Sequence, residues 1–177
     1  MNRTFETPRG TILLRSANKE DISNFRELRL EALRDLPAMF GSDYAANEAQ
    51  PIAFWEDRIF IDRNDGKVFF AEVDGQLIGM CGIMLGTSPK THHNGTIWGV
   101  YIKPAWQGLH IARALIEECT GWGSEHGCKI LKLAVVANNT SAIRCYTACG
   151  FSVYGLDPQA ICYEGKMIDE LLMSKDL

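Results

Sequence analysis

The sequence predicts a layered α/β domain with a mixed sheet, and three observations support this fold class. Segments typical of strands alternate with amphipathic helical segments along the chain. Asp74-Gly75 stands between two β-rich runs, 67–73 and 76–85, and this dipeptide favours a type I′ hairpin turn. The run 130–137 is almost wholly apolar, as expected of a strand that is covered on both faces.

The first elements follow about ten residues for which no element is predicted. A strand is expected over 11–15. Asn18 then suits the N-cap of a helix over 19–36, in which apolar residues recur every three or four positions. Pro37 ends this helix, because the residue before a proline avoids helical geometry. A second helix is expected over about 47–64.

The hairpin and a polar loop lead to a strand over 96–102, which Pro104 closes. A helix is then expected over about 108–126, because its apolar residues fall on one face. Gly127 stands at the C′ position, where a left-handed residue commonly ends a helix.

A shorter helix, over about 139–149, follows the buried strand. Gly150 occupies its C′ position, and Phe151 stands where a Schellman motif places its hydrophobic contact. Two further strands are expected around 151–156 and 160–173.

Composition and charge narrow the classes of function. The chain has 177 residues, of which 46% are hydrophobic and 23% charged, as in one ordinary globular domain. The net charge of −4, with no cluster of Lys and Arg, disfavours nucleic acids and anionic membranes as partners. No apolar run reaches the length of a membrane span and the N-terminus lacks a secretory apolar region, so we expect a cytoplasmic protein. Six scattered cysteines indicate reduced thiols and no metal site.

The helix over 108–126 begins in the segment Gln107-Gly108-Leu109-His110-Ile111-Ala112, which Arg113 follows. A helix N-terminus leaves N–H groups unpaired and carries partial positive charge, so it suits a phosphate group. An ordinary crossover from strand to helix explains the same residues. The segment matches neither the Walker A pattern nor G-x-G-x-x-G.

A second segment, Asn139 to Phe151, carries another pattern. Asn139 is a natural N-cap, and Ala142 and Tyr146 lie four residues apart on one helix face. Capping and core packing explain these residues when each is taken alone.

Together, the two segments resemble the GCN5-related N-acetyltransferase (GNAT) superfamily in order and spacing. The superfamily pattern [QR]-x-x-G-x-[GA] is present as Gln107, His110 and Ala112. The pattern N-x-x-A-x-x-x-Y-x-x-x-G-F is complete, with Asn139, Ala142, Tyr146, Gly150 and Phe151.

The resemblance implies a fold with a mixed, mostly antiparallel central sheet flanked by helices. It covers residues 11–177 as one N-acetyltransferase domain and leaves 1–10 as an N-terminal extension. It further implies transfer of an acetyl group from acetyl-CoA to a primary amine by direct attack, without a metal. A small-molecule amine is preferred over a protein N-terminus or lysine, and a homodimer is an open alternative to a monomer. A non-catalytic CoA-binding sensor or scaffold of the same fold is the alternative function.

The resemblance also assigns roles within the site. Residues 100–102 would pair with the pantetheine amides, and the backbone N–H groups of 108–113 would hold the diphosphate. Tyr146 would protonate the leaving sulfur, because an ordinary tyrosine is protonated at pH 7. The residues expected to contact acetyl-CoA are Val100, Tyr101, Ile102, Gln107, Gly108, Leu109, His110, Ile111, Ala112, Arg113, Asn139, Ala142 and Tyr146.

Two positions depart from the superfamily pattern. His110 replaces the usual glycine, and we expect a negative φ there, as in the first turn of a helix. Ala134 stands where some members carry an acid five residues before the Asn. The base is therefore open, and the candidates are Tyr101, Glu31, Glu72 and His93.

The sequence indicates less about the residues that bind the acceptor amine. Strand alternation predicts that Trp98 and Tyr101 point to opposite faces of the sheet. The net negative charge weakly favours a cationic acceptor. By analogy with the superfamily, acceptor contacts are sought in and between the first two helices, at Arg29, Phe40, Gly41, Ser42, Tyr44 and Trp55, of which Phe40 and Trp55 suit core packing better.

Overall fold

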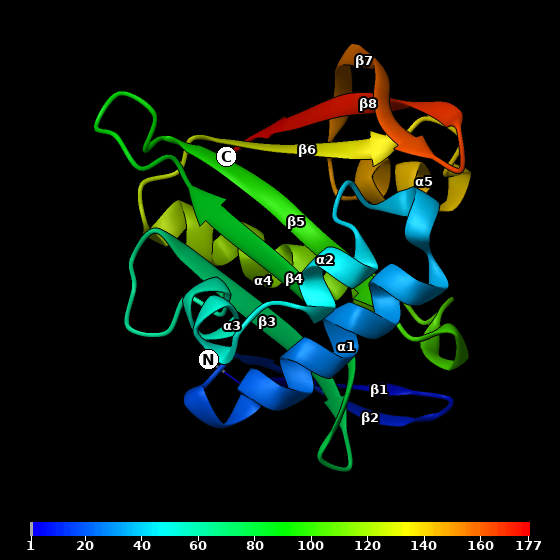
Figure 1. Cartoon of the computed structure of the whole chain (residues 1–177). Coiled ribbons are helices and arrows are strands. Elements are labelled where there is room, and N and C mark those ends of the chain that lie inside the picture. Colours follow the sequence, from blue (N-terminus) through cyan, green and yellow to red (C-terminus); the bar gives the residue numbers. More distant parts are fainter. Residues whose placement is uncertain (1) are drawn as a thin grey trace.

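The computed structural model describes residues 2–177, and these form one eight-stranded sheet (Figure 1). The strand order is β1-β2-β3-β4-β5-β6-β8-β7, and every neighbouring pair is antiparallel except β5 with β6. The prediction of a mixed, mostly antiparallel sheet is therefore confirmed. The strands are β1 (Arg3–Thr7), β2 (Gly10–Ser16), β3 (Gly66–Val73), β4 (Gln76–Leu85), β5 (Asn94–Ile102), β6 (Ile130–Val136), β7 (Ser152–Tyr163) and β8 (Lys166–Asp176).

Helices cover both faces of the sheet (Figure 1). The first three lie on one face, and α4 and α5 lie on the other. The helices are α1 (Ile22–Asp35), α2 (Tyr44–Glu48), α3 (Ile52–Arg58), α4 (Ile111–Glu125) and α5 (Thr140–Ala148). Each face buries its own hydrophobic cluster: Phe25 and Trp55 belong to the one under α1 and α3, and Leu115 and Phe151 to the one under α4 and α5.

The predicted turn and helix ends form as expected. Asp74 and Gly75 have φ values of 48° and 77°, as a type I′ turn requires. At the end of α5, Gly150 adopts φ 90° and the Phe151 N–H donates to the Tyr146 carbonyl at 3.0 Å. The Phe151 and Tyr146 rings lie 6.2 Å apart, which completes the Schellman motif.

The helix predicted over 47–64 is wrong. Two short helices, α2 and α3, occupy this region, and Pro51 stands between them with an extended ψ of 163°. Proline has no N–H to donate and disfavours helical geometry in the residue before it, so one continuous helix cannot pass through Pro51.

The ends of the chain carry more strand than predicted. Residues 3–7, within the predicted N-terminal extension, form β1 and pair with β2. β7 is longer than predicted, and a turn over Glu164 and Gly165, both of which have positive φ, interrupts the strand predicted over 160–173, so that β8 begins only at Lys166. Among residues 2–177, no helix has both the length and the hydrophobicity of a membrane span.

A β-bulge interrupts β5 at Gly99. Trp98 pairs with Gly82 and Tyr101 with Met80, so that Gly99 and Val100 together stand opposite Cys81. Gly99 adopts φ 64°, a conformation that side-chain-bearing residues avoid. The extra residue resets the alternation, and Trp98 and Tyr101 both contact the cluster under α1 and α3. The prediction that they point to opposite faces is wrong for this reason.

The strands β5 and β6 pair only over a short stretch. Their register joins 94–96 to 130–132, and beyond these residues the two strands diverge (Figure 1). Within residues 2–177, the facing edges of 97–102 and 133–136 therefore keep backbone groups that pair with no strand. This separation within the sheet positions the candidate site.

Candidate active site

A cleft of about 600 Å³ opens where β5 and β6 diverge. Residues 97–102 of β5 form one wall, and residues 133–135 of β6 form the opposite wall. The start of α4 and the inner face of α5 close the cleft, and Phe40 reaches it from the segment after α1. Of the residues expected to contact acetyl-CoA, the lining includes Val100, Tyr101, Ile102, Gln107, Gly108, His110, Ile111, Ala112, Arg113, Asn139, Ala142 and Tyr146. Leu109 lies in the same turn but does not line the cleft.

The start of α4 supplies a row of hydrogen-bond donors. Among residues 2–177, none of the backbone N–H groups from Gly108 to Arg113 has an acceptor. The Gln107 side chain donates to the Ile102 carbonyl at 3.1 Å, which ties the end of β5 to this turn. Arg113 pairs with Glu117 one turn later, so unpaired amides rather than a free cation dominate here. Such a row of N–H groups at a helix N-terminus can hold a phosphate group.

The backbone conformation of His110 differs from the predicted one. It caps α4 with φ 60° and ψ 14°, in the left-handed region, whereas a negative φ was predicted. The helix begins one residue later, at Ile111, so His110 belongs to the turn and not to the first helical turn. The backbone at this position thus has the geometry that glycine adopts most easily.

His110→Gly is expected to raise the free energy of unfolding by about 0.5–1 kcal/mol. Left-handed geometry costs a non-glycine residue roughly 1–2 kcal/mol, and the added freedom of glycine in the unfolded chain offsets about half of this. Urea unfolding monitored by circular dichroism measures the change. His92→Gly, in an exposed loop and without positive φ, is the matched control and should not gain stability. Equal or lower stability of His110→Gly would contradict the expectation.

Asn139 and Tyr146, the two polar site residues predicted at α5, have different surroundings. The Asn139 side chain accepts hydrogen bonds from the Ala142 N–H at 3.2 Å and from the Ser141 hydroxyl at 3.0 Å, so it caps the helix. Tyr146 is 9% exposed and lines the cleft. Burial, together with the nearby Cys81, Cys145 and Cys149 thiols, raises the pKa of Tyr146, which keeps its hydroxyl protonated around neutral pH.

The four candidate bases differ in their position relative to the cleft. Glu72 pairs with Arg15 at 2.6 Å on β3, two strands away from β5. His93 lies in the loop before β5, at the end where β5 and β6 are joined. Tyr101 lines the cleft and donates to Glu31 at 3.0 Å, so this pair is the one beside the cleft. Burial and the adjacent Glu31 carboxylate raise the pKa of Tyr101.

The residues predicted to contact the acceptor differ in whether they line the cleft. Trp55 is fully buried, as expected of a core residue, whereas Phe40 is half-buried and lines the cleft. Arg29 is 5% exposed and donates to the Ser42 hydroxyl at 3.3 Å. Tyr44 is engaged with Glu48 at 2.6 Å, away from the cleft lining. Gly41 is exposed and does not line the cleft.

Sequence reasoning missed Arg58, Leu36 and Met39. Leu36 and Met39 line the cleft, and Arg58 lies over Trp98. For Arg58 the sequence carries one signal: it stands four residues after Phe54 and three after Trp55, so that all three lie close together on a helix surface. The six cysteines are free, and among residues 2–177 no group of three metal-ligating side chains lies close together.

Comparison with known proteins identifies the family. The model of the acetyltransferase (GNAT) family matches residues 26–151, which include β5, α4, β6 and α5. The chain belongs to this family. Its GNAT signature residues thus lie on the elements that surround the cleft.

Relatives and solved structures agree with this membership. This GNAT protein is 26% identical over 143 residues (80% of the chain) to an uncharacterised N-acetyltransferase of Methanocaldococcus jannaschii. It is 32% identical over 123 residues (67% of the chain) to a mycothiol acetyltransferase of Sanguibacter keddieii. The chain spans 61% and 35% of the lengths of these two relatives. The structure of an acetyltransferase described as putative, from Salmonella typhimurium with its cofactor acetyl-CoA, shares the fold with a TM-score of 0.78 and 22% identity, over 94% of each chain.

Proposed function

We propose that this GNAT protein transfers an acetyl group from acetyl-CoA to a primary amine. The observation that carries the proposal is the cleft itself. The unpaired amides of α4 lie at one side of it, the unpaired edge of β5 runs along it, and the protonated hydroxyl of Tyr146 lies in its wall. These are the three kinds of group that a phosphate-bearing acyl thioester requires.

The binding roles follow from the free backbone groups. The N–H groups of 108–113 hold the diphosphate of the donor, and their partial positive charge serves in place of lysines. The free edge of 100–102 pairs with the amides of the pantetheine arm as a neighbouring strand would. Ala142 leaves space beside the arm, and Asn139 contributes its side-chain amide N–H groups, since its oxygen caps α5.

Acetyl-CoA supplies an activated acetyl carbonyl bound to a sulfur that can leave. A backbone N–H near Val100 polarises this carbonyl as the neutral amine forms the new C–N bond. Tyr146 gives its proton to the sulfur as the C–S bond breaks. The extra proton of the amine nitrogen passes to the Glu31 carboxylate through the Tyr101 hydroxyl, which takes up this proton as it gives its own to Glu31.

The test is release of free thiol from acetyl-CoA with a panel of small amines, peptides with free N-termini and lysine peptides. We expect thiol release that depends on one class of amine, with the small amines ahead of the peptides. Saturable CoA binding without thiol release on any amine would contradict the proposal and favour the non-catalytic sensor or scaffold. The cytoplasmic location, the absence of nucleic-acid partners, the choice between monomer and homodimer, and the domain boundary at residue 11 stay predictions.

A further inference from the structure

The Arg29 guanidinium is buried without an anionic partner. Only 5% of the residue is exposed, and its Nη1 has no hydrogen-bond partner among residues 2–177. Its Nη2 donates to the Ser42 hydroxyl at 3.3 Å, and the guanidinium lies 4.7 Å from the centre of the Phe40 ring. Within the described chain, no carboxylate lies within ion-pair distance of Arg29.

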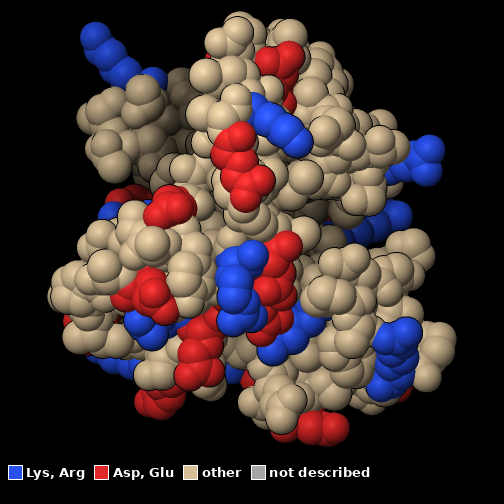
Figure 2. Space-filling view, turned by 45° about the vertical axis from the view of Figure 1, so that its right-hand side comes forward, with Lys and Arg blue, Asp and Glu red and all other residues tan. Residues whose placement is uncertain are grey.

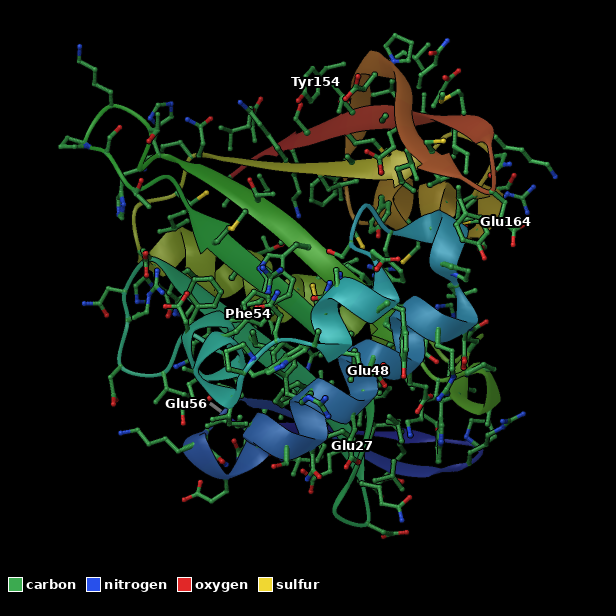
Figure 3. The ribbon with its side chains drawn as sticks, viewed as in Figure 1. Glu27, Glu48, Phe54, Glu56, Tyr154 and Glu164 are labelled. Atoms are coloured by element: carbon green, nitrogen blue, oxygen red, sulfur yellow. The ribbon has the colours of Figure 1, made fainter. Side chains whose placement is uncertain are left out.

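A second arginine increases the positive charge at this place. Arg58 of α3 lies 4.9 Å from the Trp98 ring and 5.4 Å from the ring of Phe54, which Figure 3 labels. Arg58 likewise forms no ion pair within residues 2–177. Burial and the charge of Arg58 together lower the pKa of Arg29 to about 10. The Trp98 indole N–H, also buried and without an acceptor within that range, lies against Gly82 of β4.

Stability does not explain this arrangement. A buried charge is unfavourable unless it is paired, and a well-packed hydrophobic residue in its place is often neutral or stabilising. Stacking on Phe40 and one long hydrogen bond to a neutral hydroxyl compensate only part of the desolvation. The arrangement is typical of a site that binds an anion from outside the chain.

The position of the cluster connects it to the cleft. The Nη1 atom of Arg29 is the nearest group to the empty side of Gly99, 3.8 Å from where a Cβ would stand. Gly99, Trp98 and Phe40 all line the cleft. An anion bound by Arg29 would therefore lie beside the bulge of β5, next to Val100.

We propose that Arg29, reinforced by Arg58, binds a carboxylate carried by the acceptor. The acceptor is then an amine with a carboxylate close to the amino group, as in an amino acid. This inference rests on the proposed function, and it names the acceptor class of the same cleft.

The local charge differs from the net charge of the chain. Figure 2 shows acidic and basic side chains interspersed over one face of the molecule. The residues that line the cleft include Arg113 and Arg144 but no Asp or Glu, so the overall charge of −4 does not describe the cleft. A carboxylate suits the cluster better than a phosphate, because Arg29 offers a single unpartnered nitrogen, Nη1. Arg29 does not itself line the cleft and its Nη1 has essentially no exposed surface, so side chains packed on the guanidinium, such as Phe40, must move before a carboxylate reaches it.

The experiment compares kcat/KM for L-amino acids with kcat/KM for their carboxamides, which keep the amine and lose the negative charge. We expect the wild type to prefer the acids by about 100-fold, the effect of a buried charged hydrogen-bond pair. Arg29→Met should abolish this preference by lowering kcat/KM for the acids alone. Arg34→Met, an exposed arginine of the same helix that pairs with Asp35, is the control and should keep the preference.

Other outcomes overturn the inference. Equal turnover of acids and amides by the wild type contradicts it and leaves the proposed function intact. Equal losses on both acceptors in Arg29→Met, with a lowered Tm, indicate a structural arginine instead. If no amine is acetylated, the proposed function fails. The anion site is then tested by binding alone, by comparing the rise in Tm caused by an amino acid with the rise caused by its carboxamide. A rise with the acid that Arg29→Met loses supports the site, and no difference refutes it.

Discussion

Tyr146→Phe is expected to lower kcat by about 100-fold and to leave the KM for acetyl-CoA nearly unchanged. A positioned general acid contributes roughly 10²–10⁴-fold, and we take the lower end because water can also protonate a thiolate. The substitution removes one oxygen from a side chain that is 9% exposed and packs against Phe151, so the ring contacts persist. A loss in kcat alone identifies an interaction made in the transition state.

The control is Tyr154→Phe, which removes the same atom from a tyrosine 55% exposed on β7 (Figure 3). It should leave both constants unchanged. A Tyr146→Phe enzyme with normal kcat would contradict the role of general acid, and a parallel rise in KM would indicate a binding role. Steady-state kinetics with a thiol reagent, at saturating amine, separates the three results.

Ala112→Glu is expected to abolish acetyl-CoA binding while the protein stays folded. Ala112 lines the cleft in the first turn of α4, beside the amides proposed to hold the diphosphate. A glutamate there would put a negative charge and a longer side chain where phosphate oxygens would lie. The same charge is favourable to the helix, because carboxylates near a helix N-terminus are stabilised by the helix dipole.

Isothermal titration with CoA measures the effect, and a thermal melt checks the fold. Gly121→Glu is the matched control on the same helix, because Gly121 is exposed, has open space where a Cβ would stand and does not line the cleft. It should bind CoA as the wild type does. Normal CoA binding by Ala112→Glu would show that the diphosphate lies elsewhere.

Features encoded within a few residues were predictable from the sequence. The turn at Asp74-Gly75 and the Schellman motif at Gly150 depend on local backbone preferences, and both form as predicted. All but one of the residues expected to contact acetyl-CoA line the cleft, because the family patterns fall on the elements that surround it.

Features that depend on neighbouring strands or on missing partners were not predictable. The bulge at Gly99 changes the face of Tyr101, and a single extra residue in a pairing leaves no clear mark in one strand. His110 has φ 60° because α4 begins at Ile111, three residues after the predicted start near 108, which leaves His110 in the turn before the helix. The unpaired charge of Arg29 depends on what the whole fold places around it.

The divergence of β5 and β6 has a mechanical consequence. Among residues 2–177, three residue pairs between β5 and β6 are the only strand pairing that joins β1 to β5 with β6, β8 and β7, so the sheet is two panels connected at one end. Along the rest of their length, side chains from both panels pack in the cluster under α4 and α5. An extended ligand that pairs with the edge of β5 and contacts α5 bridges the open end like a missing strand. If acetyl-CoA binds as proposed, its binding is expected to stiffen the whole sheet.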